Sequence, residues 1–101
     1  MQVNLQVKEG KAKLVLSGRF DFNSHREFRS GCDEAMNSPK INEIEIDLGV
    51  VDYLDSSALG MLLLLRERAV ASNKKLALAN CRGTVKQVLD VANFSQLFTI
   101  R

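Results

Sequence analysis

The stretch IEIDLGVVDYLDSSALGMLLLL, residues 44–65, changes its periodicity in the middle. Ile44, Ile46 and Leu48 alternate with acidic residues, and this period of two predicts a strand with one buried face and one wet face. From Ser56 to about Ser72 the apolar residues recur at helical spacing instead. The stretch therefore predicts a strand followed by a helix that begins at the DSS sequence.

One strand after this strand–helix unit and a hairpin of two strands before it complete the predicted sheet. Lys74 to Asn80 has a strand pattern, and a strand–helix–strand unit is nearly always parallel and right-handed. Near the amino terminus, apolar residues recur at period two on both sides of Glu9-Gly10, which predicts an antiparallel hairpin with a two-residue turn. The predicted pairs place apolar residues on one face: Val7 with Ala12, Leu5 with Leu14, and Val3 with Leu16.

Two further helices are expected. The first has Asn23 or Ser24 as its cap, ends near Asn37, and buries one face. That face consists of Phe28, Cys32 and Ala35 or Met36. The second buries Val85, Val88, Leu89 and Ala92, and a short turn or helix follows through Leu97, Phe98 and Ile100. The whole chain, residues 1–101, is predicted to be one α/β domain, with a small mixed sheet opened by an antiparallel hairpin and helices packed mainly on one face.

Composition argues against several classes of protein. The 14 Lys and Arg against 12 Asp and Glu are spread along the chain, and with no Trp and one Tyr they do not predict nucleic-acid binding. The apolar run Met61 to Leu65 is far shorter than the roughly 20 residues that cross a bilayer. No signal peptide is recognisable, so we expect a soluble, reduced, cytoplasmic protein without direct membrane insertion. Cys32 and Cys81 form no zinc-like spacing with His25, and we expect buried or half-buried thiols and neither metal nor cofactor.

Catalysis is not predicted either. The chain contains no G-x-S-x-G motif, and Gly49 and Gly60 are isolated rather than part of a phosphate-binding loop. His25 is expected to be exposed in the first turn of a helix. We therefore expect a binding protein and not an enzyme.

The segment Asp55-Ser56-Ser57 has two explanations. A Ser or Asp here can cap the helix by accepting hydrogen bonds from its first N–H groups. The alternative is a functional site, because the segment follows the carboxyl end of a strand, where ligand and partner sites of α/β sheets gather. The helix adds a second ambiguity, because it is apolar around more of its circumference than one core face requires. Its predicted core stripe is Ala58, Leu62, Leu65 and Ala69, and the flanking apolar residues either wrap the core or meet a partner.

Three segments together resemble the STAS domain family, particularly bacterial anti-sigma factor antagonists. They are IDLGVVDYLDSSALGMLL (Ile46 to Leu63), LSGRFD (Leu16 to Asp21) and VKQVLDVANFSQLFTI (Val85 to Ile100). The resemblance covers nearly the whole chain. The sequence departs from the usual pattern at Ala58, where Gly often occurs, and at Cys81 and Arg82, where a Pro-containing turn is frequent.

The resemblance implies a switch between partners. In this family the domain binds an anti-sigma factor that is also a serine kinase, phosphorylation releases it, and a serine phosphatase restores the binding form. The acceptor position falls on Ser56, the preceding acid of the motif is Asp55, and Asp21 matches an acidic position in the loop after the second strand. STAS domains also serve in lipid transport and other multiprotein complexes, so a constitutive subunit is the alternative, and the oligomeric state stays open.

The partner surface is expected where two segments meet. If the second strand lies beside the strand Ile44–Leu48, their carboxyl ends place Asp21 and Asn23 near Asp55 and Ser56. We expect a footprint with Asp21, Asn23, Asp55 and Ser57 as its polar rim and Leu59 and Met61 as its apolar part. Asp21 is expected to contribute little to stability, since it lies in a loop.

Overall fold

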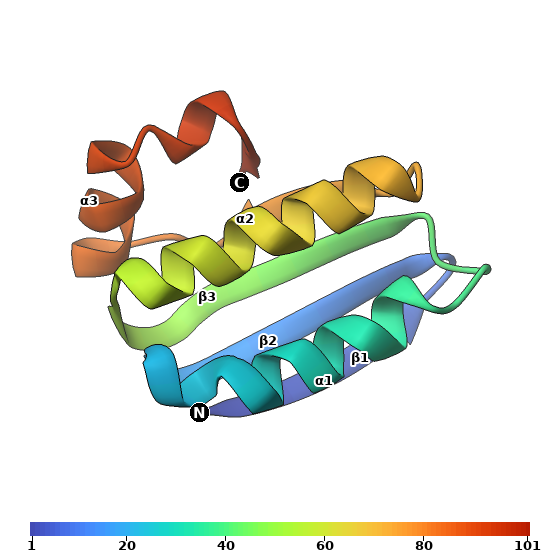
Figure 1. Cartoon of the computed structure of the whole chain (residues 1–101), viewed down its shortest axis with the longest axis horizontal. Helices are drawn as coiled ribbons and strands as arrows, with labels where there is room; N and C mark the ends of the chain where they lie inside the picture. The colour runs from blue at the N-terminus through green and yellow to red at the C-terminus, as the bar shows by residue number, and fades with distance from the viewer.

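The computed structural model describes residues 1–101 and contains a five-stranded mixed sheet. In chain order its elements are β1 (Gln2–Lys8), β2 (Lys11–Phe20), η1 (Phe22–Ser24), α1 (His25–Met36), β3 (Glu43–Leu54), α2 (Ser56–Ala71), β4 (Lys75–Ala79), α3 (Gly83–Val91), η2 (Phe94–Gln96) and β5 (Thr99–Ile100). The strands lie in the order β1-β2-β3-β4-β5. Only β1 and β2 are antiparallel, and the other neighbours are parallel (Figure 1).

The predicted hairpin is confirmed with its register. Val3 lies opposite Leu16, Leu5 opposite Leu14 and Val7 opposite Ala12. Glu9 and Gly10 form the two-residue turn, both with positive φ (52° and 81°), as the favoured hairpin turns require. Local pattern and turn chemistry therefore agree on one pairing.

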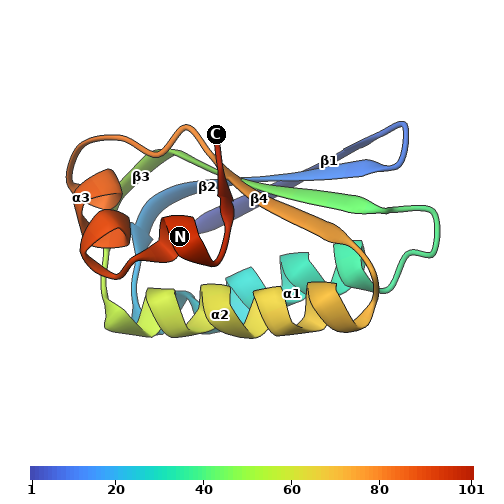
Figure 2. The same cartoon turned by 90° about the horizontal axis from the view of Figure 1, so that it is seen from above.

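Two helices cover the same face of the sheet. Figure 2 shows α1 and α2 side by side beneath it, while α3 lies at the end of the sheet beside β3 and the opposite face is free of helices. The core lies between the sheet and these two helices, and the buried strand residues include Leu14, Leu16, Phe20, Ile44, Ile46 and Leu48. Both predicted helical faces are confirmed, since Phe28, Cys32, Ala35 and Met36 of α1 and Ala58, Leu62, Leu65 and Ala69 of α2 are all buried.

The central strand is longer than the sequence pattern predicts. β3 does not end at Leu48 but continues to Leu54, directly before α2. Its second half pairs with β2 from Ser17–Val50 to Phe20–Leu54, and the register shifts twice along this pairing. Each shift interrupts the period of two, so the alternation that marks the first half of the strand is lost.

The predicted wet face of β3 is mostly covered. Glu45 and Asp47 point to the face without helices, yet only 8% and 7% of their surface is exposed. Lys11 Nζ lies 3.2 Å from a Glu45 carboxylate oxygen, and Lys13 Nζ lies 3.4 Å from Asp47. Arg101 donates to Glu45 at 2.9 Å. Ion pairs with these long side chains accompany the burial of both carboxylates, so the expectation that this face of the strand is wet is corrected at Glu45 and Asp47.

We expect the ion pairs of Glu45 to make the folding stability decrease at acidic pH. Burial by itself would raise the pKa of Glu45, but the hydrogen bonds from Lys11 and Arg101 outweigh it and hold the pKa below its ordinary value. A carboxylate with a depressed pKa in the folded state contributes stability above the unfolded pKa, and this contribution is lost as pH falls through the folded pKa.

Thermal unfolding between about pH 6 and pH 3, across the ordinary carboxylate range, measures this contribution. The midpoint of the wild-type protein is expected to fall more steeply with acid than that of Glu45→Gln. Equal slopes for the two proteins would contradict the assignment.

A fifth strand at the sheet edge was not predicted. Thr99 and Ile100 pair with Ala77 and Leu78 of β4, where the sequence suggested only a short turn or helix. Two residues carry no periodicity, so the strand exists only through its tertiary pairing. The pairing brings the carboxyl-terminal Arg101 to the charged face of the sheet.

Candidate functional site

The two loops that were expected to meet do so at the carboxyl edge, the edge where β2, β3 and β4 end. Phe20 at the end of β2 is the register partner of Leu54 at the end of β3. The backbone N–H of Asp55 donates to the carbonyl of Phe20 at 3.3 Å. Asp21 and Asp55 each follow one member of this residue pair, so the predicted juxtaposition of the two segments is confirmed (Figure 1).

Asp55, and not a serine, caps α2. Its backbone is extended, and its Oδ1 accepts the N–H of Ala58 at 3.0 Å. Ser56 is the first residue of the helix, it is exposed, and its hydroxyl makes no hydrogen bond within the protein. Ser57 is half-buried. The capping explanation therefore accounts for Asp55 and leaves the hydroxyl of Ser56 free.

The opposite loop is organised around Asp21. Its Oδ1 accepts the N–H of Asn23 at 3.0 Å, while its own N–H donates to Ser24 Oγ at 3.2 Å. Ser24 Oγ in turn donates to the carbonyl of Arg19 at 2.8 Å. Ser24 occupies the cap position of α1 without a side-chain capping bond, and Asn23 is exposed. The expectation that Asn23 or Ser24 is the cap residue is confirmed for Ser24, and the turn that leads into the helix is held by the side chain of Asp21 through η1.

The capping bond of Asp21 leads us to revise the expectation that its side chain contributes little to stability. Asp21→Ala is expected to lower the free energy of unfolding by about 1 kcal/mol, the usual cost of losing such a cap. Asp21→Asn should cost much less, because Asn caps about as well. Urea unfolding of the two variants measures the difference. Equal losses in both would mean that the charge of Asp21, and not its capping bond, matters for stability.

Arg19, a cationic residue at this edge, was not singled out by the sequence analysis. Arg19 lies over the ring of Tyr53, with its guanidinium carbon 4.0 Å from the ring centroid. Its Nε also lies 3.4 Å from Asp21 Oδ2. Arg19 and Tyr53 are register partners on β2 and β3, so the signal that could have found them is the parallel pairing of the two strands.

The apolar part of the predicted footprint needs revision. Met61 is only 8% exposed and lies between α1 and α2, and Leu59 is half-buried against the core. The exposed side of α2 carries Gly60, Leu63 and Leu64 instead. Phe22, 73% exposed in η1, adds a second apolar side chain that the sequence did not single out.

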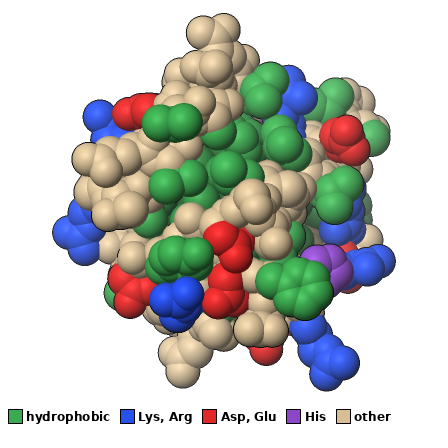
Figure 3. Space-filling model, turned by 60° about the vertical axis from the view of Figure 1, so that its left-hand side comes forward, with side chains coloured by type: hydrophobic (Ala, Val, Ile, Leu, Met, Phe, Trp, Pro, Cys, Tyr) green, Lys and Arg blue, Asp and Glu red, His purple; other side chains and the backbone are tan.

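Figure 3 looks onto the carboxyl edge. Hydrophobic side chains gather in the middle of this face, and acidic side chains lie beside them together with a basic one. His25, the only histidine of the chain, lies at the margin and is exposed as expected. The face therefore combines an apolar centre with a charged rim, the usual composition of a protein interface.

Both cysteines are free thiols. Cys32 is buried, and burial raises the pKa of its thiol to about 12; Cys81 is half-buried, and burial raises its pKa as well. Neither is expected to react readily, because the thiolate is the reactive form. No three His, Cys, Asp or Glu side chains are grouped as a metal site would require. None of the helices combines the length and apolar character needed to cross a membrane.

Comparison with known proteins places the whole domain in one family. Residues 3–99 match the family model described as "Mlab, STAS domain". A STAS-domain containing protein of Pseudomonas aeruginosa is 46% identical over 87 residues, covering 86% of this chain and 84% of that protein.

Among solved structures, an anti-sigma-factor antagonist (STAS) domain protein of Planctomyces limnophilus superposes with a TM-score of 0.84 at 16% identity, covering 99% of this chain and 88% of that one. The Bacillus cell fate determinant SpoIIAA in its phosphorylated form superposes with a TM-score of 0.74 at 18% identity, covering 98% and 90% of the two chains. These two likenesses concern the fold, while the family follows from the matched residues: the chain belongs to the STAS domain family.

Proposed function

We propose that this domain is an anti-sigma factor antagonist that works by partner switching. In its unmodified form it binds an anti-sigma factor that is also a serine kinase. Phosphorylation of Ser56 releases the partner, and a serine phosphatase restores the binding form. The domain itself performs no chemistry and acts in the cytoplasm on transcription.

The observation that carries the proposal is the free hydroxyl of Ser56. It stands exposed at the first position of α2, where its side chain leaves the end of the helix, and Asp55 already satisfies the capping requirement. A kinase can therefore reach Ser56 without unfolding the helix. A phosphate at this position also faces the free N–H groups and the positive end of the helix dipole, which tolerate an anion.

The surroundings of Ser56 suggest why modification changes binding. Asp55 adjoins it in sequence, and Asp21 follows the paired end of the neighbouring strand. A phosphate adds roughly 1.5 to 2 negative charges to this acidic rim. A partner surface that fits a neutral hydroxyl would then have to desolvate a dianion beside carboxylates.

The proposed footprint centres on Ser56 and reaches along two segments. Its polar rim keeps Asp21, Asn23, Asp55 and Ser57. Its apolar part keeps Leu59 at the edge and adds Phe22, Gly60 and Leu64, while Met61 supports the helix from beneath. Gly60 has open space where a side chain would stand, so a partner backbone can approach α2 closely there.

The site of modification is tested by mass spectrometry. After incubation with ATP and the kinase recovered with the protein, we expect one phosphate, located on Ser56. Ser56→Ala should accept none, and Ser57→Ala, the matched control, should be phosphorylated like the wild type. A phosphate on Ser57 only, or on no serine, would contradict the assignment.

The footprint is tested with variants that keep the fold. Asp21→Asn retains the cap but removes the charge, and we expect it to weaken binding of the unphosphorylated protein about fivefold, roughly 1 kcal/mol. Isothermal titration calorimetry against the kinase measures this, with circular dichroism as the folding control. Wild-type affinity in a folded Asp21→Asn protein would place the β2–α1 loop outside the interface.

A second candidate is a constitutive subunit of a larger assembly such as a lipid transport complex. It is favoured by the matched family model, whose description names Mlab and not an anti-sigma factor antagonist. This candidate predicts binding that is independent of the state of Ser56. A pull-down with the wild type and Ser56→Asp separates the two: loss of an ATP-binding serine kinase or sigma-regulating protein in Ser56→Asp supports the switch. Equal recovery of a transporter permease and ATPase by both proteins supports the subunit.

A further inference from the structure

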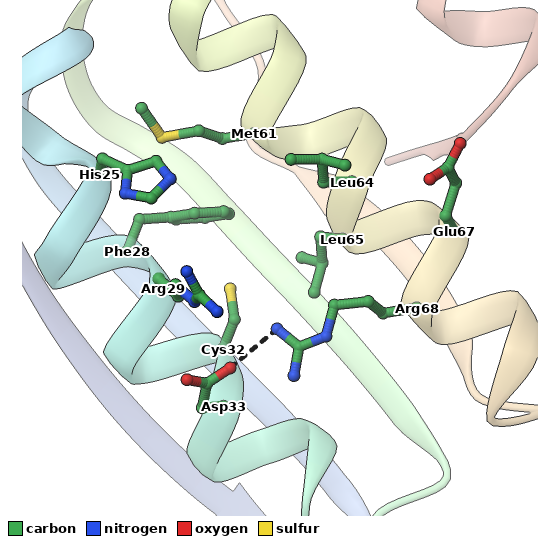
Figure 4. Close-up of a pocket in the computed structure, with 10 residues that line it drawn as sticks. All are labelled: His25, Phe28, Arg29, Cys32, Asp33, Met61, Leu64, Leu65, Glu67 and Arg68. Carbon is green, nitrogen blue, oxygen red and sulfur yellow. Dashed lines mark ion pairs between the residues drawn. The ribbon is translucent and has the colours of Figure 1, made fainter.

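A hollow of about 420 Å³ lies between α1 and α2, outside the loops that meet at Ser56. Its lining is mixed, and its apolar side chains come from the two facing helices: Phe28, Cys32, Met61, Leu64 and Leu65 (Figure 4). All of these except Leu64 are nearly buried. Cavities of roughly 300 to 1,000 Å³ with mostly apolar walls and a few polar groups are typical of small-molecule sites. This hollow lies at the small end of that range.

Two arginines and two carboxylates line the hollow, and only one of each forms an ion pair. Arg68 on α2 reaches across to Asp33 on α1, with Nη1 and Oδ1 2.8 Å apart, so these two charges compensate each other. Glu67 also lines the hollow from α2 but makes no ion pair with either arginine. Arg29 lies on the α1 side of the hollow between Phe28 and Cys32, and it makes no ion pair. One guanidinium without an ion pair therefore stands at the edge of an apolar floor.

The floor itself carries no charge. Burial raises the pKa of the Cys32 thiol to about 12, so the thiol is neutral at physiological pH. Met61 is unbranched and flexible, which lets the wall adapt to an apolar guest. A guanidinium presents two parallel N–H donors that match a planar carboxylate. The hollow thus offers hydrophobic contact along its floor and a bidentate partner at its rim.

We propose that the hollow between α1 and α2 binds a small amphipathic carboxylate, with the hydrocarbon part on the apolar floor and the carboxylate on Arg29. The hollow does not include Ser56, but it borders the proposed partner footprint through Met61 and Leu64. It uses side chains of the first three turns of α1 and of the middle of α2.

Decanoate is the probe that tests the site. The ¹⁵N-labelled protein is titrated with sodium decanoate below its critical micelle concentration, and amide shifts are followed by NMR. Saturable shifts are expected for residues 28–33 and 61–68, with smaller effects elsewhere. Decyltrimethylammonium, which has the same hydrocarbon length and the opposite charge, should bind more weakly than decanoate.

Two arginines on the same helix make a matched pair of variants. Arg29→Gln is expected to weaken decanoate binding about tenfold, because it removes a charged hydrogen-bond donor. Arg26→Gln removes the same charge from α1 on the side that faces β1, and should change the affinity less than about twofold. Decanol, which has no charge, should bind both variants and the wild type equally. Arg29→Lys keeps the charge but loses the two parallel donors, so its affinity should lie between that of the wild type and that of Arg29→Gln.

Three results would overturn the proposal. The first is the absence of saturable shifts between α1 and α2. The second is an equal loss of decanoate affinity in Arg29→Gln and Arg26→Gln, which would indicate a general effect of net charge. The third is equal binding of the cationic and anionic probes. Thermal unfolding of each variant shows that the comparison is made on folded protein, as expected for two exposed arginines.

Discussion

Phosphorylation of Ser56 is expected to weaken binding of the anti-sigma partner by about 30-fold to several-thousand-fold, which corresponds to roughly 2 to 5 kcal/mol. The fold should not change, because a phosphate at the first position of α2 meets the positive end of the helix and its free N–H groups. The cost falls on the complex, in which the dianion beside Asp55 must lose its water against a surface shaped for a hydroxyl.

Calorimetric titration of the partner with both forms of the protein measures the loss. Ser56→Ala should bind like the unphosphorylated wild type and be insensitive to the kinase. Ser56→Asp should show a smaller loss than the phosphoprotein, because one carboxylate carries less charge than a phosphate. Ser57→Ala, treated with the kinase, should lose affinity as the wild type does. Unchanged affinity of the phosphorylated wild type would reject partner switching at Ser56 and leave the constitutive subunit.

The second large effect concerns stability and lies in the run of four leucines in α2. Leu62→Ala is expected to lower the free energy of unfolding by about 2 to 5 kcal/mol, because Leu62 is fully buried and its loss leaves a cavity in the core. The unfolding midpoint of a domain of this size should fall by roughly 10 °C or more. Urea and thermal unfolding followed by circular dichroism measure both quantities.

Leu64→Ala is the matched control for this substitution. This substitution removes the same atoms from the same helix, two residues away from Leu62. However, 59% of the surface of Leu64 is exposed. Its loss should change stability by no more than about 0.5 kcal/mol, as for other surface positions. Similar losses for the two variants would mean that α2 is rotated relative to the sheet, and the orientation of the Gly60–Leu64 surface would then be wrong.

Local patterns were sufficient for much of the fold and for part of the site. The hairpin register follows from a period of two on both sides of a two-residue turn, because a shift of one residue would move every apolar side chain to the wet face. The buried stripe of α2 follows from helical spacing in the same way. Ser56 could be placed at a helix start because the periodicity changes immediately before it.

Long-range contacts decided the rest. The continuation of β3 to Leu54 depends on pairing with β2 through two register shifts, and β5 exists only because it lies beside β4. Local periodicity does not encode which strands pair. The prediction from periodicity therefore ended β3 too early and did not include β5.

The same division applies to the site. Sequence patterns were enough to place a helix start at the DSS segment, and they placed the loop after β2 next to it on the condition that β2 lies beside β3. The packing of the elements was needed to show that Asp55 provides the cap, that Asp21 holds the entry to α1, and that Met61 turns inward while Leu64 stays exposed. The physical reason is that helical spacing gives the angle between side chains around a helix, whereas burial depends on which other elements pack against each side, and α1 covers the side of Met61.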